Sequence, residues 1–238
     1  MKTFWNYKDK HNNKPYFSCQ YFSYILMINL GVLISGSGNT LQNFIDQIAA
    51  GKLNAAIRVV ISSKPNVVGL DRARKHNIPT AVVPHTNYKD IGTFSHAITA
   101  ELDKYPIDLI TLAGFIHLYK IPDKYKGRVM NIHPGLIPAF CGHNYYGNKV
   151  HEAVINYGAK ISGCTVHFAD NVYDNGPIII QRTVPVLDDD TPQSLASRVF
   201  QEECEAYPEA IRLFAAGRLK TEDRKVRILN PKEIKDEK

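Results

Sequence analysis

Cysteine is scarce in this chain of 238 residues, and long hydrophobic runs are missing. The four cysteines, Cys19, Cys141, Cys164 and Cys204, form no CxxC pair and have no spacing typical of a zinc site. A disulfide scaffold is therefore not expected, and reduced thiols indicate a cytoplasmic protein. Because no stretch of about 18 apolar residues occurs, no membrane-spanning helix is expected either.

Concentrated positive charge is also missing from most of the chain. The net charge of +6 and the pI near 9.0 would suit a polyanionic partner. However, residues 1–26 hold four lysines against one aspartate, and the basic residues that follow are dispersed rather than striped. We therefore expect a solvated surface and no nucleic-acid partner.

The length and composition suit one globular domain, with 44% hydrophobic and 22% charged residues. Residues 1–26 are polar and aromatic, without a helix or strand pattern and without the features of a signal peptide. They are interpreted as an extension that is disordered, loosely docked or the product of a misassigned start. The predicted domain covers residues 27–230, and a charged tail covers residues 231–238.

From Met27 onward, apolar segments alternate between a strand pattern and a helix pattern. This alternation predicts an α/β fold with a mainly parallel central sheet and helices on both faces, which is a Rossmann-like architecture. The predicted strands cover residues 28–34, 57–62, 80–83, 108–113, 129–132, 162–168 and 177–186. The predicted helices cover residues 40–50, 69–76, 91–104, 150–157 and 194–216.

A glycine-rich turn joins the first predicted strand to the first predicted helix, with the sequence Ser35-Gly-Ser-Gly-Asn-Thr40. Such a turn brings backbone N–H groups and the positive end of a helix to one point, which favours a phosphate group. Gly36 and Gly38 would let the backbone approach a ligand, and Asn39 and Thr40 could add side-chain donors. The motif matches neither GxGxxG nor a P-loop, and a capped tight turn without a ligand is the alternative.

The fifth predicted strand ends in Asn131-Ile-His-Pro134, at an edge where α/β proteins bind ligands. Strand alternation places the side chains of Asn131 and His133 on the same side of the sheet. An amide donor beside an imidazole suits an oxygen that becomes negatively charged during a reaction. These two residues are therefore the first candidates for catalysis.

A carboxylate near His133 would raise the pKa of the imidazole and fix its tautomer. Asp174 is the candidate, although the sequence Asp174-Asn-Gly-Pro177 also favours a turn, so a purely structural role is the alternative. The run over residues 112–118 suits either the wall of a pocket for a flat aromatic ligand or simple core packing. Further polar candidates are His151, His167 and Glu203.

Together these motifs resemble the phosphoribosylglycinamide formyltransferase family, the folate-dependent enzymes of purine synthesis. The resemblance covers residues 27–229, and several motifs follow the family's order and spacing. The set is highly specific, although each motif alone is only moderately so. The motifs are Ile34-Ser-Gly-Ser-Gly-Asn-Thr-Leu-Gln42, Leu112-Ala-Gly-Phe115, Asn131-Ile-His-Pro134, Val166-His-Phe168, Asp174-Asn-Gly-Pro177, Gln201-Glu-Glu203 and Tyr207-Pro208.

The resemblance implies a formyltransferase fold and a role for each site residue, and it implies no metal. The implied catalytic trio is Asn131, His133 and Asp174. The residues implied to bind the ribonucleotide are Gly36, Gly38, Asn39, Thr40 and Glu203. The residues implied to bind the folate are Lys89, Ile116, His117, Leu118, Tyr119, Asn131 and Asp170, with residues 170–174 closing the pterin pocket.

The chain departs from the family pattern at several positions. His117 stands where arginine is frequent, and Gly135 follows His-Pro where serine is common. An arginine frequent near residues 89–91 is missing, so Lys89 is expected to contact the glutamate tail of the folate instead. Residues 140–147 form a longer version of a loop near the substrate. None of these changes falls on the implied catalytic trio.

The expected reaction is direct transfer of the formyl group of 10-formyltetrahydrofolate to the amine of 5-phosphoribosylglycinamide. Asn131 and a protonated His133 would stabilise the formyl oxygen, and Asp174 would hold the imidazole. These two small molecules are the expected partners, and the chain is expected to act as a monomer or a homodimer.

Other functions are alternatives at this point. A methionyl-tRNA formyltransferase would need a sizeable C-terminal domain, and a formyltetrahydrofolate hydrolase would usually carry a regulatory domain in front. A non-catalytic nucleotide-binding module would use the glycine-rich turn but would leave Asn131 and His133 unexplained. A basic nucleic-acid binder is the least favoured alternative.

Overall fold

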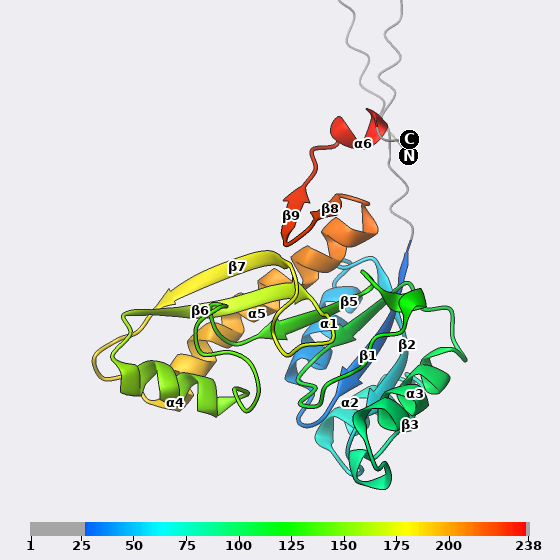
Figure 1. Ribbon diagram of the computed structural model, residues 1–238, viewed down its shortest axis with the longest axis horizontal. Coiled ribbons are helices and arrows are strands. Elements are labelled where there is room, and N and C mark those ends of the chain that lie inside the picture. Colours follow the sequence, from blue (N-terminus) through cyan, green and yellow to red (C-terminus); the bar gives the residue numbers. More distant parts are fainter. Residues whose placement is uncertain (1–26, 237–238) are drawn as a thin grey trace, which may run out of the picture.

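The computed structural model describes residues 27–236, so the predicted extension over residues 1–26 lies outside the described residues. In the described part, nine strands form one sheet in the order β3-β2-β1-β4-β5-β6-β7-β9-β8 (Figure 1). The strands are β1 Ile28–Ile34, β2 Ala55–Ser62, β3 Thr80–Val82, β4 Leu109–Leu112, β5 Val129–His133, β6 Ile161–Phe168, β7 Ile178–Pro185, β8 Leu219–Glu222 and β9 Lys225–Ile228.

Helices connect most of these strands. None of the helices within residues 27–236 is long and apolar enough to cross a membrane. Every strand and helix predicted from the sequence is present, with bounds within two residues of those expected. The helices are α1 Asn39–Ala49, α2 Val68–Lys75, α3 Ile91–Leu102, α4 Asn148–Tyr157, α5 Pro192–Ala215 and α6 Glu233–Asp236, with short 3₁₀ helices η1 His85–Asn87 and η2 Asp123–Tyr125.

The sheet is parallel in its first half and mixed in its second. From β3 to β5 each strand runs parallel to its neighbours, whereas β6 is antiparallel to both β5 and β7. The short connection over residues 169–177 leaves no room for the crossover that a parallel β6–β7 pair would need. β9 pairs with β7 in parallel, and β8 is antiparallel to β9. The predicted mainly parallel sheet is confirmed, with an antiparallel section at β6 and β7.

β1 lies where the strand order reverses. The chain moves from β1 outward through β2 to β3 and then returns to the other side of β1 with β4 and β5. In open α/β sheets, ligands bind beyond the carboxyl ends of the strands at this reversal. The segments that follow β1, β4 and β5 are therefore neighbours at one edge of the sheet.

Two hydrophobic cores cover opposite faces of the sheet. Leu30, Val32 and Ile34 of β1 pack with α1, α2, α4 and α5, whereas Leu33 packs with α3. Burial on both faces explains why β1 is apolar along nearly its whole length. Gly31 lets α3 approach, since a Cβ there would lie 2.6 Å from a methyl carbon of the side chain of Leu102.

A single tyrosine fastens the long helix α5 to the ends of two strands. The hydroxyl of Tyr207, which is fully buried, donates to the carbonyl of Met130 at 2.7 Å and lies 3.3 Å from the carbonyl of Leu112. Glu203 is one turn earlier on the same face of α5. The anchor at Tyr207 therefore also brings Glu203 toward the ends of β4 and β5.

The C-terminal part contains elements that the sequence does not predict. β8 and β9 form a hairpin that turns at Asp223, and α6 lies within the predicted charged tail. The N–H of Asn230 donates to the Glu233 carboxylate at the start of α6. Most residues of this hairpin are exposed or half-buried, so no apolar periodicity marks the two strands in the sequence.

Candidate active site

A cavity of about 630 Å³ lies beyond the carboxyl ends of β1, β4 and β5. Its walls are residues 35–40, 112–119 and 131–134, the loops at 142–148 and 169–174, and part of α5. Every site residue expected from the sequence lines this cavity except Lys89. Lys89 is exposed between η1 and α3, outside the lining formed by the described residues, so its contact with a folate tail stays a prediction.

The turn between β1 and α1 presents the start of a helix to the cavity. Gly38 precedes α1 with a φ of 69°, and the N–H of Gln42 donates to the Gly38 carbonyl in the first turn of the helix. The N–H groups between these residues have no partner inside the helix, and no side chain of the described residues caps α1. Asn39 and Thr40 line the cavity here, so the positive end of α1 is open to an anion.

Gly38 is required by packing as well as by its backbone conformation. A Cβ at Gly38 would lie 2.7 Å from the Cα of Gly69 in α2, and the N–H of Gly69 donates to the Gly36 carbonyl. A Cβ at Gly36, by contrast, would meet no heavy atom of the described residues within 4 Å. The structure thus gives Gly38 a folding role that the sequence does not indicate, whereas Gly36 faces open space.

Arg72 of α2 holds the same turn from outside. Its guanidinium donates to the Ser37 carbonyl at 2.9 Å, to Asn39 Oδ1 at 3.2 Å and to Gln42 Oε1 at 3.1 Å. These contacts fix the turn and add a positive charge near the start of α1. The sequence carries no signal for this role, because a helix with several basic residues is typical of a solvated surface.

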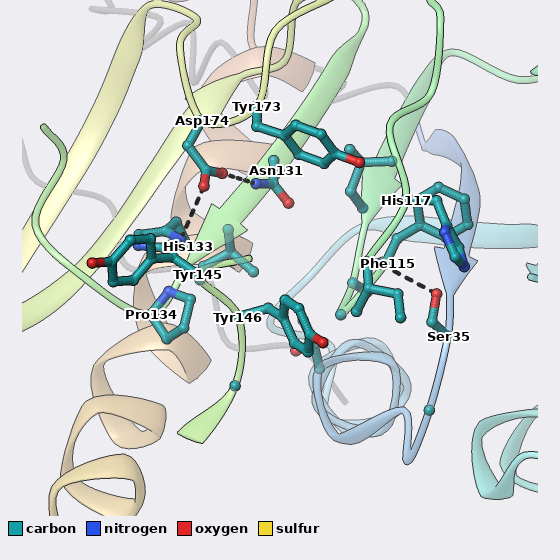
Figure 2. A pocket seen from close by; sticks show the side chains of 18 of the residues that line it. Ser35, Phe115, His117, Asn131, His133, Pro134, Tyr145, Tyr146, Tyr173 and Asp174 are labelled. Carbon is teal, nitrogen blue, oxygen red and sulfur yellow. Dashed lines mark hydrogen bonds and ion pairs between the residues drawn. The ribbon is translucent and has the colours of Figure 1, made fainter. Parts of the chain in front are cut away.

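At the other end of the cavity, Asp174 joins Asn131 and His133 (Figure 2). Asn131 Nδ2 donates to Asp174 Oδ1 at 3.2 Å, and His133 Nδ1 lies 3.4 Å from Asp174 Oδ2. The N–H of Gly142 donates to the same Oδ2 at 2.8 Å. Asp174 also has a φ of 50°, a left-handed conformation that Asp and Asn tolerate better than most residues. Asp174 therefore both adopts the conformation of a turn residue and contacts His133.

His167 on β6 completes this group, directly opposite Asn131 on β5. Its Nδ1 donates to the Phe168 carbonyl at 2.8 Å, so Nε2 of the neutral ring accepts from Asn131 Nδ2 at 3.2 Å. The two amide hydrogens of Asn131 thus serve Asp174 and His167, and its carbonyl oxygen points away from Asp174 (Figure 2). If Asn131 is to donate to a formyl oxygen, the ligand must replace one of these two acceptors.

Burial and neighbouring polar or charged groups shift the pKa of His133 in opposite directions, and they do the same to the pKa of Asp174. Burial lowers the pKa of His133, and the carboxylate of Asp174 only partly offsets it. Burial alone would raise the pKa of Asp174, but hydrogen bonds to its carboxylate, the one from the Gly142 N–H among them, hold it below its usual value. Asp174 therefore acts on His133 in the predicted direction, yet burial dominates and the imidazole is neutral at pH 7. Its Nε2–H donates to the Phe140 carbonyl at 2.9 Å, which leaves Nδ1 as the basic nitrogen.

The ring of His133 is packed between Gly135 and α4. A Cβ at Gly135 would lie 2.9 Å from His133 Nε2 and 3.2 Å from a methyl carbon of Val150. Gly135, which is expected to depart from the family pattern, thus leaves room for this ring. Burial and the neighbouring His133 lower the pKa of His151 to about 4, and Nδ1 of His151 has no partner within the described residues.

The segment after β4 forms the opposite wall and is held largely by its backbone. The N–H of Ile116 donates to Ser35 Oγ at 3.2 Å, and the N–H of Leu118 donates to the Tyr173 hydroxyl at 3.0 Å. The side chain of Tyr119 is buried in the core under α3, so Tyr119 lines the cavity through its main chain. These contacts tie the wall to the loop that contains Asp174.

Asp170 stabilises that same loop rather than reaching across the cavity. Its carboxylate accepts from the N–H of Val172 at 2.9 Å and from Asn175 Nδ2 at 2.8 Å. Asn171 accepts from the N–H of Ile121 at 2.8 Å, which adds a second tie between the loop and the opposite wall.

His117, which the resemblance places where arginine is frequent, is neutral at pH 7. Burial, with help from His85 and Lys64, lowers its pKa to about 4. Its ring is stacked on His85 with 4.1 Å between the centroids and 4° between the planes. Lys64 also lines the cavity and supplies positive charge on this side. The sequence indicates a role for Lys64 in the site only through its position just after β2, because ligands bind at strand ends.

Glu203 lines the cavity from α5, as the resemblance implies. Burial raises the pKa of its carboxyl to about 7. A half-protonated carboxyl near neutral pH can donate as well as accept a hydrogen bond, which suits a hydroxyl-rich ligand.

The fold is that of a formyl transferase, and the model of the formyl transferase family matches residues 28–211. The solved glycinamide ribonucleotide transformylase 1 of Symbiobacterium toebii is 42% identical, with a TM-score of 0.79 over 86% of this chain and 95% of that one. The chloroplastic phosphoribosylglycinamide formyltransferase of Arabidopsis thaliana is 34% identical over 87% of this chain and 72% of that protein. The chain belongs to the phosphoribosylglycinamide formyltransferase family.

Longer relatives carry the same region as one part. The trifunctional purine biosynthetic protein adenosine-3 of Bos taurus is 42% identical over 190 residues, which are 79% of this chain. The chain spans only 18% of the length of that relative. The family expected from the sequence is thus confirmed.

Proposed function

We propose that this chain transfers the formyl group of 10-formyltetrahydrofolate to the amine of 5-phosphoribosylglycinamide, a step of purine synthesis. The main support is that one cavity contains both an open helix start, suited to a phosphate, and the group of Asn131, His133 and Asp174. A ribonucleotide with its phosphate at α1 would extend toward this group. The wall over residues 116–119 is proposed to hold the folate.

The proposed reaction needs no covalent enzyme intermediate. The amine nitrogen attacks the formyl carbon, and the bond between that carbon and N10 of the folate breaks as the tetrahedral intermediate collapses. The amine gives up one proton and N10 takes up one, so the protons balance. His133, neutral before the attack, accepts the proton at Nδ1, where Asp174 Oδ2 lies 3.4 Å away.

The protonated form of His133 expected from the sequence is thus proposed for the reaction rather than for the resting enzyme. The imidazolium and the amide of Asn131 stabilise the negative charge on the formyl oxygen. Asp174 holds the imidazolium by charge and is itself held by the N–H of Gly142. The binding roles of Gly36, Gly38, Asn39, Thr40 and Glu203, and of Lys89, Ile116, His117, Leu118, Tyr119, Asn131 and Asp170, belong to this proposal.

The proposed setting is the cytoplasm, where the thiols of Cys141, Cys164 and Cys204 would stay reduced. The proposed partners are the two small molecules, with the chain as a monomer or a homodimer.

A formyl-transfer assay with both substrates tests the proposal. Product should form only when the ribonucleotide and 10-formyltetrahydrofolate are both present. Two parallel reactions serve as controls, one without any acceptor and one with methionyl-tRNA as the acceptor. Rapid hydrolysis of the donor without an acceptor, or transfer to the tRNA, would contradict the proposed substrate.

A further inference from the structure

The resemblance implies that the loop over residues 140–147 is a longer version of a loop near the substrate, and residues 142–147 line the cavity. Its backbone takes left-handed conformations at Phe140, Gly142, Asn144 and Gly147. Gly147 has a φ of 54° and a ψ of −138°, a combination that is essentially restricted to glycine. The chain turns sharply here to begin α4, directly after Tyr146.

Tyr146 lies across the middle of the cavity. Figure 2 shows its ring between His133 and Pro134 on one side and Ser35 and Phe115 on the other. The side chain lines the cavity, and the residue is 41% exposed. Tyr145 is similarly exposed, at 39%, and also lines the cavity.

Lys149, in the first turn of α4, holds the ring of Tyr146. Its Nζ is 4.7 Å from the ring centroid and 3.4 Å from the hydroxyl oxygen. A lysine ammonium only donates, so the hydroxyl oxygen of Tyr146 is the acceptor in this contact. The hydroxyl hydrogen therefore stays available to donate to a ligand.

We infer that Tyr146 is a specificity-determining residue that recognises the ribose of the ribonucleotide. This inference rests on the proposed function, since a phosphate at α1 and an amine at His133 leave the sugar between them. The apolar face of the tyrosine ring packs against the carbon face of the sugar, and the hydroxyl donates to a ribose oxygen. The aromatic ring and its hydroxyl together distinguish a sugar phosphate from a bare phosphate.

Two probe ligands, ribose 5-phosphate and inorganic phosphate, distinguish binding of the sugar from binding of the phosphate. Their dissociation constants are measured by calorimetry for the wild type, Tyr146→Phe, Tyr146→Ala and the control Tyr145→Ala. Tyr146→Ala should weaken ribose 5-phosphate binding roughly 5- to 10-fold, because one hydrogen bond and one packing contact are lost. Tyr146→Phe should weaken it roughly threefold, and Tyr145→Ala less than about twofold. Inorganic phosphate should bind all four proteins equally within about twofold.

The inference is overturned if Tyr146→Ala weakens both probes equally, or neither, or if the wild type binds ribose 5-phosphate no more tightly than phosphate. Because these measurements need no formyl transfer, they stand even if the proposed reaction fails. In the formyl-transfer assay, Tyr146→Ala should raise the KM for the ribonucleotide and leave the KM for the folate unchanged. A wild type without transfer activity would reject the proposed function alone.

Discussion

The two ends of the cavity are built in different ways. The end proposed to bind the phosphate, called the anion end below, consists of six consecutive residues, 35–40, and it offers a ligand the backbone N–H groups of a helix start. The end proposed to carry out the reaction, called the reacting end below, consists of side chains from β5, β6 and one loop and a backbone N–H from a second loop. The contact between Asn131 and Asp174 joins residues 43 positions apart. One end is thus local in sequence, and the other exists only after the chain has folded.

This difference predicts which property a substitution should change at each end. Backbone groups at the anion end depend on the conformation of the turn, so changes there should alter folding and ribonucleotide binding together. Side chains at the reacting end can be exchanged with little change of conformation, so changes there should alter turnover. The following predictions test whether the two ends separate in this way.

The largest effect is expected at His133. His133→Gln removes the group proposed to accept a proton and to stabilise the formyl oxygen, so kcat should fall roughly 100-fold or more. The KM for the ribonucleotide should change by less than about threefold, because the phosphate is proposed to bind at the other end. His143→Gln, a change on the same cavity wall that leaves the trio intact, is the matched control and should keep kcat near the wild-type value. A loss in kcat of less than about threefold for His133→Gln would contradict its role.

The next prediction compares two glycines in the anion turn. Gly38→Ala should lower the free energy of unfolding by about 1–3 kcal/mol, because φ is 69° and the Cβ would lie 2.7 Å from Gly69 Cα. Gly36→Ala should change the free energy of unfolding by less than about 0.5 kcal/mol, because its Cβ would point into open space. Urea unfolding measures both values. Equal destabilisation by the two changes would show that the packing against α2 does not decide the role of Gly38.

Gly36→Ala also isolates binding from folding at the anion end. If a ligand approaches the backbone at Gly36, the added methyl group should raise the KM for the ribonucleotide while the KM for the folate stays constant. An equal rise in both KM values would move the phosphate site away from this turn.

Asp174→Asn should reduce kcat roughly tenfold, about 1.4 kcal/mol of transition-state stabilisation. The left-handed φ of 50° suits asparagine as well, so thermal unfolding should change little. Without the carboxylate, the pKa of His133 should fall further, and the acid limb of kcat against pH should move to lower pH. The control is Asp170→Asn, which changes a carboxylate of the same loop that holds Val172 and Asn175 instead of His133. Equal kcat profiles for Asp174→Asn and the wild type would leave only the turn role.

The smallest effect concerns stability against pH at the reacting end. His151 has a pKa of about 4 in the folded protein, below the usual value of 6.5, so the unfolded chain binds its proton first as the pH falls. The contribution of His151 to the free energy of unfolding is fully present above pH 6.5, and it declines as the pH falls from 6.5 toward 4. Between pH 7.5 and pH 6 the loss should be roughly 1 kcal/mol. Urea unfolding at both values should show a smaller loss for His151→Gln, and an equal loss would assign the pH dependence to other groups.

Much of the fold follows from local patterns. The strand over residues 28–34 has the predicted bounds because a mostly apolar run, which ends at the polar turn beginning with Ser35, is buried on both faces. The hairpin of β8 and β9 was not predictable in the same way, since its exposed residues do not follow an apolar period. The family resemblance implied a catalytic role for Asp174, whereas the residues alone left a purely structural turn role as the alternative.

By itself, the sequence determined the alternation of strands and helices, the glycine-rich turn before α1 and the placement of Asn131 and His133 on one side of β5. These features depend on residues that are close together in the chain. Only the tertiary structure decided that Gly142, from another loop, donates to Asp174, that Arg72 holds the anion turn and that Tyr146 crosses the cavity. It also decided that His133 is neutral, because the loss of solvation depends on everything packed around a group and not on its neighbours in sequence.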